Sequence, residues 1–308
     1  EAIKLSELSF SIQAFPYGED PASWPNFFQQ AIQAAQVTGQ QIGIEPRNLR
    51  VLEMDLLQQS APQTRFIPAE AVIAGLRMYK NEAEVAAMRQ AARIAQQALQ
   101  ATLPLIRPGV SERSIAAELT AQLLRHGSEP NLPFFPIIAS GPNSANPHAF
   151  PTERTLQAGD LIVIDWGATV HGYFSDITRT FALEPVPDKS REIAGIVLAA
   201  NQAGRQVARP GIQAREVDQA ARNVIEQAGF GEYFIHRTGH GLGMETHEEP
   251  YIRADNELLL KTGMTFTIEP GIYLPDQAGV RIEDDVIITE DGLESLTDLP
   301  RQLISLGR

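Results

Sequence analysis

Two aspartates eleven positions apart, Asp165 and Asp176, are the first residues of this sequence that could do chemistry. Asp165 ends the apolar run LIVID, and Asp176 follows in SDITRT. The segment between them reads as a hairpin, and a loop centred on Val170–His171 would set the two acids opposite each other, about 5 Å apart. Like charges this close repel, and a shared cation would remove the repulsion. The alternatives are a different register, or an Asp165 that only begins a turn.

Two glutamates extend this pattern toward the end of the chain. Glu269 ends the strand-like segment MTFTIE. The segment GVRIEDDVIIT alternates, with apolar residues on one side and Arg281 and Glu283 on the other. Glu283 is therefore predicted to face the other acids, although a single glutamate on a strand is usually a solvated edge residue. Asp284 and Asp285 are expected to be such solvated residues.

Histidines gather in the segment RTGHGLGMETHEEP. His240 lies between glycines, which lack side chains and so allow the imidazole to approach a ligand closely. His236 precedes it and His247 follows it within a short stretch. One histidine in apolar surroundings is usually structural, but three in this stretch beside glycines favour a functional site.

Four carboxylates and one imidazole suit two divalent ions. Such ions are borderline-hard, and manganese, cobalt, iron or zinc would fit oxygen and nitrogen ligands. Paired ions roughly 3.5 to 4 Å apart can hold a shared hydroxide at neutral pH, which predicts water as the nucleophile. The sequence has no cysteine, so thiolate metal sites, disulfides and cysteine nucleophiles are excluded.

An internal duplication predicts how these residues are positioned. RPGVSER at 107–113 recurs as RPGIQAR at 209–215, an offset of 102 residues. AGDLIVIDWG at 158–167 matches TGMTFTIEPG at 262–271 in pattern, an offset of 104, with an acid at the same place in each. These offsets predict two helix-helix-strand halves related by a pseudo-twofold axis, with a site between them.

The remaining elements divide the chain into two expected domains. Asn81 and Glu84 form a capping-box start for a long helix that Pro104 ends. The earlier residues predict a helix over 25–37, an extended segment over 41–45 and a helix over 49–59. We therefore expect an N-terminal domain over 1–77 and a catalytic domain over 78–308. The chain begins at Glu1 rather than methionine, so residues are expected to precede it.

Composition narrows the class of protein. The 308 residues carry a net charge of -13, which would repel nucleic acid and anionic membrane surfaces. No apolar run reaches the roughly 18 residues that span a bilayer, and no basic and apolar leader opens the chain. We expect a cytoplasmic protein without nucleic-acid or membrane partners.

A family resemblance rests on six motifs in a fixed order: VIDWG, SDITRT, GHGLG, HEEP, IEPGIY and RIEDD. Over about residues 78–300 they resemble the catalytic domain of the pita-bread metallopeptidases, which include proline dipeptidase, aminopeptidase P, methionine aminopeptidase and creatinase. The resemblance implies an α+β pita-bread fold with the pseudo-twofold duplication. The residues before it resemble the second half of a creatinase-type N-terminal α/β domain, with GEDP at 18–21, so that domain is expected to be truncated.

The resemblance also implies roles for individual residues. Five match the family's metal ligands: Asp165, Asp176, His240, Glu269 and Glu283. Asp176 and Glu283 are similar to the ligands that serve both ions, and Glu269 to the residue that relays the water's proton. His247 and His148 match catalytic histidines that donate hydrogen bonds to developing charge. His236 and Arg281 match substrate-binding positions of the proline-directed branch.

The same resemblance implies a reaction. The RIED motif and the N-terminal domain indicate hydrolysis of the Xaa-Pro bond with two divalent ions, with manganese the expected metal and cobalt, zinc or iron the alternatives. We expect an Xaa-Pro dipeptidase that forms a homodimer and takes small peptides with proline at the second position. Aminopeptidase P, which acts on longer peptides, is the first alternative. A non-catalytic binding module of the same fold is the second, which five intact ligands disfavour.

Overall fold

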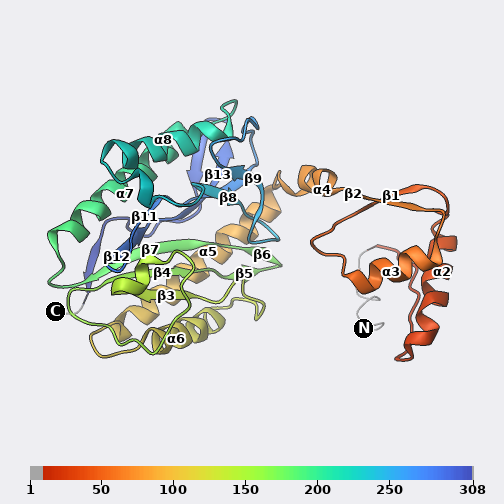
Figure 1. The fold of residues 1–308 in the computed structure, drawn as a ribbon, viewed down its shortest axis with the longest axis horizontal. Helices are drawn as coiled ribbons and strands as arrows, with labels where there is room; N and C mark the ends of the chain where they lie inside the picture. Colours follow the sequence, from red (N-terminus) through yellow and green to blue (C-terminus); the bar gives the residue numbers. More distant parts are fainter. Residues whose placement is uncertain (1–9, 307–308) are drawn as a thin grey trace. The chain divides into compact units, whose positions relative to one another are not determined.

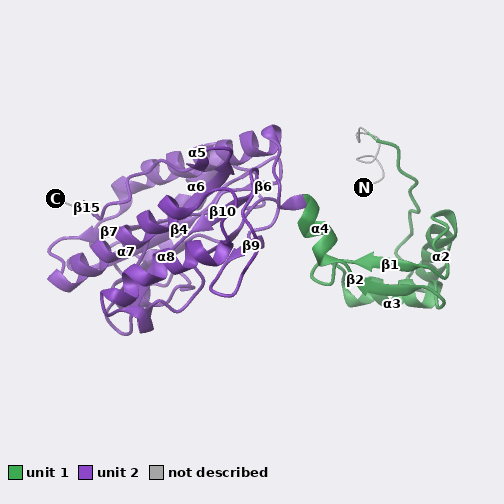
Figure 2. Cartoon of the chain, turned by 90° about the horizontal axis from the view of Figure 1, so that it is seen from above, with its two compact units in different colours: residues 1–76 green, residues 77–308 purple. Residues whose placement is uncertain are grey.

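The computed structural model describes residues 10–306, which form two compact units that divide between Leu76 and Arg77 (Figure 2). From residue 10 onward, the first unit contains two parallel paired strands, β1 and β2, and three α-helices. Its elements are η1 (Pro21–Ser23), α2 (Trp24–Ala34), β1 (Gln41–Ile44), α3 (Val51–Ser60), β2 (Arg65–Pro68) and α4 (Glu70–Arg77). The helices and the strand expected before residue 60 are therefore present.

The second unit begins with the long helix that the capping pattern predicts. Helix α5 spans Glu82–Thr102, and its first turn is closed by reciprocal bonds between Asn81 and Glu84. The Glu84 carboxylate accepts from the Asn81 N–H at 2.7 Å, and the Asn81 side chain accepts from the Glu84 N–H at 3.1 Å. Pro104 lies in the short 3₁₀ turn Leu103–Leu105, where the α-helix has ended.

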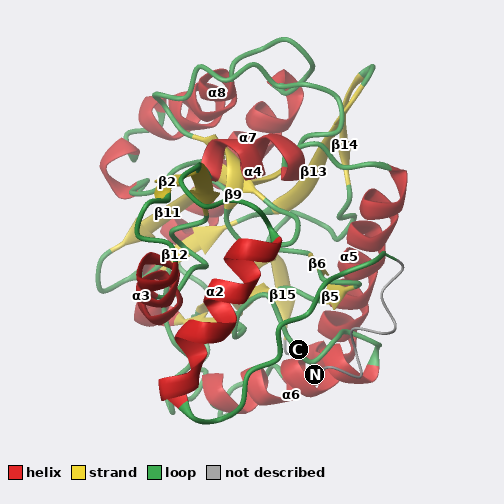
Figure 3. Ribbon diagram, turned by 90° about the vertical axis from the view of Figure 1, so that its right-hand side faces the viewer, coloured by secondary structure: helices red, strands yellow, loops and turns green. Residues whose placement is uncertain are grey.

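Two helix pairs repeat along this unit. Helix α6 spans Glu112–Arg125, α7 spans Asp188–Val207 and α8 spans Ala214–Gln227, so α8 begins and ends 102 residues after α6 (214 − 112 and 227 − 125). The α5–α6 and α7–α8 pairs lie on different sides of the strands (Figures 1 and 3).

The backbone contacts before each second helix repeat as well. The Gly109 N–H donates to the Leu156 carbonyl at 2.8 Å, and the Gly211 N–H donates to the Leu260 carbonyl at 2.8 Å. Both glycines have positive φ, 88° and 86°, a backbone conformation that side chains disfavour. The offsets of 102 and 104 residues that the sequence shows thus recur in hydrogen bonds, which supports the duplication.

The strands of this unit form two main sheets. One has the order β15-β7-β4-β3 and the other β14-β13-β10-β8-β9. The first consists of β15 (Ile304–Leu306), β7 (Ile177–Leu183), β4 (Leu161–Trp166) and β3 (Ile137–Ser140). The second consists of β14 (Gly292–Ser295), β13 (Asp284–Thr289), β10 (Thr265–Ile268), β8 (Gly239–Gly241) and β9 (Glu248–Ile252). Short pairs complete the unit: β5 (Thr169–Val170) with β6 (Tyr173–Phe174), and β11 (Gly271–Leu274) with β12 (Ala278–Arg281).

The hairpin that carries the first two acids is present, but its expected register is wrong by two residues. Asp165 pairs with Thr178, not with Asp176. The turn residues are His171 and Gly172, with φ of 51° and 75°, because a two-residue turn of this hand needs positive φ at both positions and glycine supplies one of them. A shift of two keeps the side-chain parity, so Asp165 and Asp176 remain on one face of the hairpin.

The last predicted strand is broken rather than continuous. It divides into β12, which pairs with β11, and β13, which pairs with β10 and β14. Pro270 separates β10 from β11 on the partner side, and proline has no N–H to continue the pairing. Glu283 lies at the break and bridges to Thr178 of β7. The break therefore joins the last strand to the first sheet.

The core of this unit packs the helices against the strands. Trp166 at the end of β4 is fully buried among residues of α5, α6 and the first sheet, and its indole N–H donates to the Ala95 carbonyl at 2.8 Å. A rigidly packed strand end is a suitable support for Asp165, its neighbour. Within residues 10–306, no helix combines the length and the apolar character that a membrane crossing requires.

Candidate metal centre

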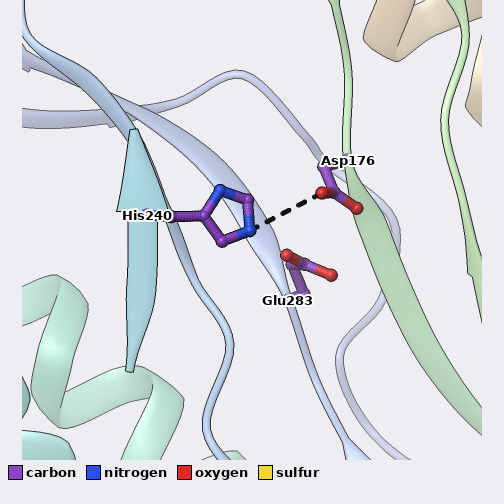
Figure 4. A group of neighbouring side chains, drawn as sticks. All are labelled: Asp176, His240 and Glu283. Atoms are coloured by element: carbon purple, nitrogen blue, oxygen red, sulfur yellow. Dashed lines mark ion pairs between the residues drawn. The ribbon is translucent and has the colours of Figure 1, made fainter. Parts of the chain in front are cut away.

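Three side chains from three separate segments point at one another in Figure 4. Asp176 precedes β7, His240 lies in β8, and Glu283 lies between β12 and β13. One ligand atom from each lies within 4.8 Å of the other two. Since β7 belongs to the first half of the duplication and β8 to the second, this cluster draws on both halves.

The other two predicted ligands lie beside this cluster. The distance from His240 Nε2 to Glu269 Oε1 is 3.3 Å, and from His240 Nε2 to Asp176 Oδ2 it is 3.7 Å. Asp165 and Glu269 line the same cavity of about 610 Å³ as the three residues of Figure 4. The structure thus brings all five predicted ligands to one cavity.

Burial and mutual repulsion make these carboxylates reluctant to ionise. Burial first, and then the nearby Glu283 and Asp165, raise the pKa of Asp176 well above its ordinary value. Burial and then Glu269 raise the pKa of Glu283 in the same way. Burial also raises the pKa of Glu269 to about 7, although Arg281 opposes it. The site therefore needs either protons or cations to offset its negative charge.

The histidine has the tautomer that a metal ligand requires. His240 Nδ1 lies 3.1 Å from the Gly241 carbonyl, which can only accept, so Nδ1 carries the proton. The unprotonated Nε2 then faces the carboxylates. Burial, followed by the charge of His247, lowers the pKa of His240 well below its ordinary value, which keeps the ring neutral. A neutral imidazole with one nitrogen fixed to the backbone is the usual form of a ligating histidine.

Asp165 supplies a further sign of a cation site. Its Oδ2 accepts from Arg281 Nη2 at 2.5 Å. Its Oδ1 is buried and has no hydrogen-bond partner among the described residues. A buried carboxylate oxygen left without a partner is costly unless something else binds it. A donor set of four carboxylates, one of which has an open oxygen, and one neutral imidazole fits divalent metal ions.

Two residues that hold the predicted ligands were not expected from the sequence. Thr178 donates its hydroxyl to Glu283 Oε2 at 2.6 Å. Asp285 accepts the backbone N–H of Asp176 at 3.0 and 3.2 Å through its two oxygens. Such contacts orient ligands and are part of a metal site.

The expectation that Asp284 and Asp285 are solvated is therefore wrong. The two residues are 0% and 1% exposed. Asp284 accepts from Arg179 at 2.8 Å and from Arg301 at 2.7 Å. Burial alone would raise the pKa of Asp284, but the charges and hydrogen bonds of Arg179 and Arg301 together outweigh it and lower that pKa. The sequence EDD at 283–285 did contain a signal for Asp285, because side chains alternate along a strand and Asp285 therefore falls on the same side as Glu283.

The other four predicted residues, His148, His236, His247 and Arg281, line the same cavity. The His247 ring lies edge-on to the His240 ring, with centroids 4.2 Å apart.

His236 and Arg281 are joined by a residue that was not predicted, Tyr273. Arg281 Nη1 donates to the Tyr273 hydroxyl at 2.9 Å, and that hydroxyl lies 2.9 Å from His236 Nε2. Burial, and then the Arg281 charge, lower the pKa of His236 to about 3, so this histidine is neutral.

The rest of the cavity wall is largely apolar. Its residues include Phe134, Phe135, Ile137, Pro147, Phe150 and Pro151. Two arginines, Arg237 and Arg253, also line it and were not expected from the sequence, where nothing distinguishes them from surface arginines. The cavity volume is in the range of small-molecule sites.

Metal binding is expected to release protons near neutral pH. The pKa of Glu269 is about 7 and those of Asp176 and Glu283 are raised well above their ordinary values, so these groups hold protons that a cation must displace. Proton competition should thus weaken metal affinity as pH falls below about 7. Titration calorimetry of manganese binding in buffers of different ionisation enthalpy measures the release. The Glu269→Gln variant should release less; equal release from both proteins would contradict the assigned protonation of Glu269.

Comparisons with known proteins give results that agree with this geometry. A sequence model of metallopeptidase family M24 matches residues 86–290. An Xaa-Pro dipeptidase of Lactobacillus delbrueckii subsp. lactis is 38% identical over 304 residues, 98% of this chain and 82% of that protein.

Two solved structures are also similar. A recombinant prolidase from Thermococcus sibiricus has a TM-score of 0.92 at 37% identity and covers 99% of this chain and 82% of its own. An X-Pro aminopeptidase from Thermotoga maritima has a TM-score of 0.84 at 34% identity, with coverages of 94% and 81%.

Proposed function

This chain belongs to metallopeptidase family M24, and on that premise we propose that it hydrolyses the peptide bond between a residue and a following proline, with Xaa-Pro dipeptides as its main substrates. Its second unit has the mixed α/β pita-bread fold of the family. The observation that carries the proposal is the single cavity lined by five potential metal ligands, three further histidines and Arg281.

The five residues that would hold two divalent ions are Asp165, Asp176, His240, Glu269 and Glu283. Bound divalent ions supply a water molecule that loses a proton easily near neutral pH and polarise the substrate carbonyl. Support for this assignment comes from the raised pKa values of the buried carboxylates and from the unpartnered oxygen of Asp165.

Glu269 is the residue that moves the proton. A carboxylate that would hold a metal ion through one oxygen keeps its other oxygen to accept a proton and to return it. The imide nitrogen of proline is a poor leaving group until it is protonated. Glu269 therefore receives the proton of the attacking water and delivers it to that nitrogen.

His148 and His247 act on the substrate rather than on the metal. Both line the cavity, and donors placed near a carbonyl stabilise the negative charge that develops on its oxygen. The apolar wall suits the proline ring, which has no N–H to satisfy. Arg281 and His236, joined through Tyr273, form a rigid polar side of the same cavity.

Replacement of His148 or His247 by Ala is expected to lower kcat by roughly 10²- to 10³-fold. Metal content should stay at the wild-type level because neither residue is assigned as a ligand. Steady-state kinetics and metal analysis by mass spectrometry of each purified variant measure the two quantities. Loss of metal from either variant would make that histidine a ligand and contradict the assignment.

Aminopeptidase P activity is the second candidate, which the similarity to the Thermotoga maritima enzyme favours. The two activities differ in whether the cavity admits residues beyond the proline. The deciding experiment compares kcat/KM for Ala-Pro with kcat/KM for Ala-Pro-Ala and a longer Ala-Pro peptide at saturating manganese. Preference for Ala-Pro supports the dipeptidase, preference for the longer peptides supports the aminopeptidase, and cleavage of none contradicts both.

Further features are part of the same proposal. Manganese is the proposed metal, the homodimer the proposed assembly and the cytoplasm the proposed compartment. We also assign residues 1–77 to a creatinase-type N-terminal domain and residues 78–308 to the catalytic domain. The parallel pair β1 and β2 with helices α2 and α3 supports an α/β assignment for the former.

A further inference from the structure

The loop that carries His148 into the cavity is held from outside the cavity by one buried carboxylate. Glu112 is the first residue of α6 and is 0% exposed, yet it does not line the cavity. His148 itself is exposed, and its neighbour Phe150 is 79% exposed. Burial of these two side chains therefore does not fix His148. Its position depends on its buried loop neighbours and on hydrogen bonds to the loop, which include the bond from Arg281 Nη1 to the Pro147 carbonyl at 3.2 Å and those to Glu112.

Glu112 contacts both ends of this loop. Its Oε1 accepts from the Ser140 N–H at 2.8 Å and from the Ser140 hydroxyl at 2.7 Å. Its Oε2 accepts from the Thr152 N–H at 3.0 Å and from the Thr152 hydroxyl at 2.6 Å. The Asn143 amide donates to both oxygens at 3.1 Å. A single buried carboxylate thus ties together three points of the segment 140–152.

The duplication separates the role of this side chain from the role of its backbone. The Glu112 N–H donates to the Arg154 carbonyl at 3.0 Å, and the equivalent Ala214 N–H donates to the Leu258 carbonyl at 2.9 Å. The fold therefore needs the backbone contact in both halves. Of these two equivalent positions, only Glu112 carries a carboxylate, because the other is occupied by Ala214. Glu112 belongs to the half whose loop carries His148.

We propose that Glu112 is a positioning residue for the reaction, which sets the place of His148 in the cavity through its hydrogen bonds to Ser140, Asn143 and Thr152. This inference rests on the proposed function, in which His148 donates to the developing charge. Gln at this position keeps the shape but replaces one acceptor oxygen with an N–H₂ donor, so it repels the donors that face it. A displacement of about 1 Å in a catalytic group can lower a rate by about 10²-fold.

The test uses the full chain with manganese and three variants: Glu112→Gln, His148→Ala and the two combined. Glu112→Gln should lower kcat by roughly 10- to 100-fold with unchanged metal content. The double variant should be no slower than His148→Ala, because a residue that acts through His148 has nothing left to position. Losses that multiply, or a wild-type kcat for Glu112→Gln, would overturn the proposal.

Two controls separate positioning from loss of stability. Leu119→Ala removes a fully buried side chain from the same helix α6 and should lower Tm without a comparable fall in kcat. The ring signals of His148 in nuclear magnetic resonance spectra of the metal-free protein should shift in Glu112→Gln and not in Leu119→Ala. Unshifted His148 signals in Glu112→Gln would contradict the proposal without reference to activity.

A milder variant covers the case in which Glu112→Gln does not fold. Thr152→Val keeps the carboxylate but removes the hydroxyl, which donates to Glu112 Oε2 and accepts from the Arg154 N–H and the Asn143 amide. It should lower kcat less, again without further loss in combination with His148→Ala. A multiplied loss would overturn the proposal here too. A wild-type protein that cleaves no Xaa-Pro peptide would instead contradict the proposed function, while the His148 spectra would still test the positioning by Glu112.

Discussion

Glu269→Gln is expected to lower kcat for Ala-Pro hydrolysis by about 10²- to 10⁴-fold, which is the usual contribution of a positioned proton-transfer group. Gln keeps the shape and one ligand oxygen of Glu269 but cannot accept and return a proton. The change in KM should be small, since the leaving nitrogen needs its proton only in the transition state.

Kinetics and bound metal measured on the same samples decide this prediction. Glu257→Gln is a matched control, because Glu257 is exposed and pairs with Arg215 away from the cavity. It should behave as wild type. A Glu269→Gln protein with full metal content and near-normal kcat would show that another group, such as His247, is the base.

Asp176→Ala is expected to remove bound metal and with it the activity. Asp176 belongs to the cluster, with a ligand atom within 4.8 Å of those of both His240 and Glu283. Its loss should lower the metal content from two ions per chain to less than one and reduce hydrolysis to the level of a chelated wild-type sample.

Thermal stability provides a second measure of the same variant. Removal of a buried carboxylate that repels its neighbours should leave the metal-free protein at least as stable as wild type. Addition of manganese should raise the Tm of wild type and of the exposed-site control Asp188→Ala, but not that of Asp176→Ala. Full metal content in Asp176→Ala would remove this residue from the ligand set.

The sequence predicted the elements well where a local signal exists. The capping box of Asn81 and Glu84 places the start of α5, and the repeated RPG motifs place both glycines that precede α6 and α8. Each signal is a short run of neighbouring residues, so the conformational preferences of that run are sufficient to predict where the helix begins.

The sequence was less informative where the local structure depends on a partner strand or on another distant segment. The register of the hairpin depends on which residues adopt positive φ, and the pair His171–Gly172 was not recognised as the turn. The break at Glu283 lies opposite the break at Pro270, which separates the partner strands β10 and β11. The burial of Asp284 depends on arginines from distant segments, Arg179 and Arg301.

The candidate site was predicted more completely than the fold around it. Side-chain parity placed Asp165 and Asp176 on one face even with the wrong register, because an error of two residues preserves the face. The supporting residues Thr178, Tyr273 and Glu112 were not predicted. Each acts through a contact with a residue more than five positions away, and such a contact leaves no pattern in a single sequence.

The most direct test of the central claim is a crystal structure of the manganese-loaded protein with anomalous scattering recorded at a wavelength suited to manganese. The proposed dinuclear site should give two anomalous peaks in the cavity, with oxygen or nitrogen atoms of Asp165, Asp176, His240, Glu269 and Glu283 at about 2.0 to 2.3 Å from them. A single peak, peaks outside the cavity, or any of the five side chains more than about 5 Å from both ions would contradict it.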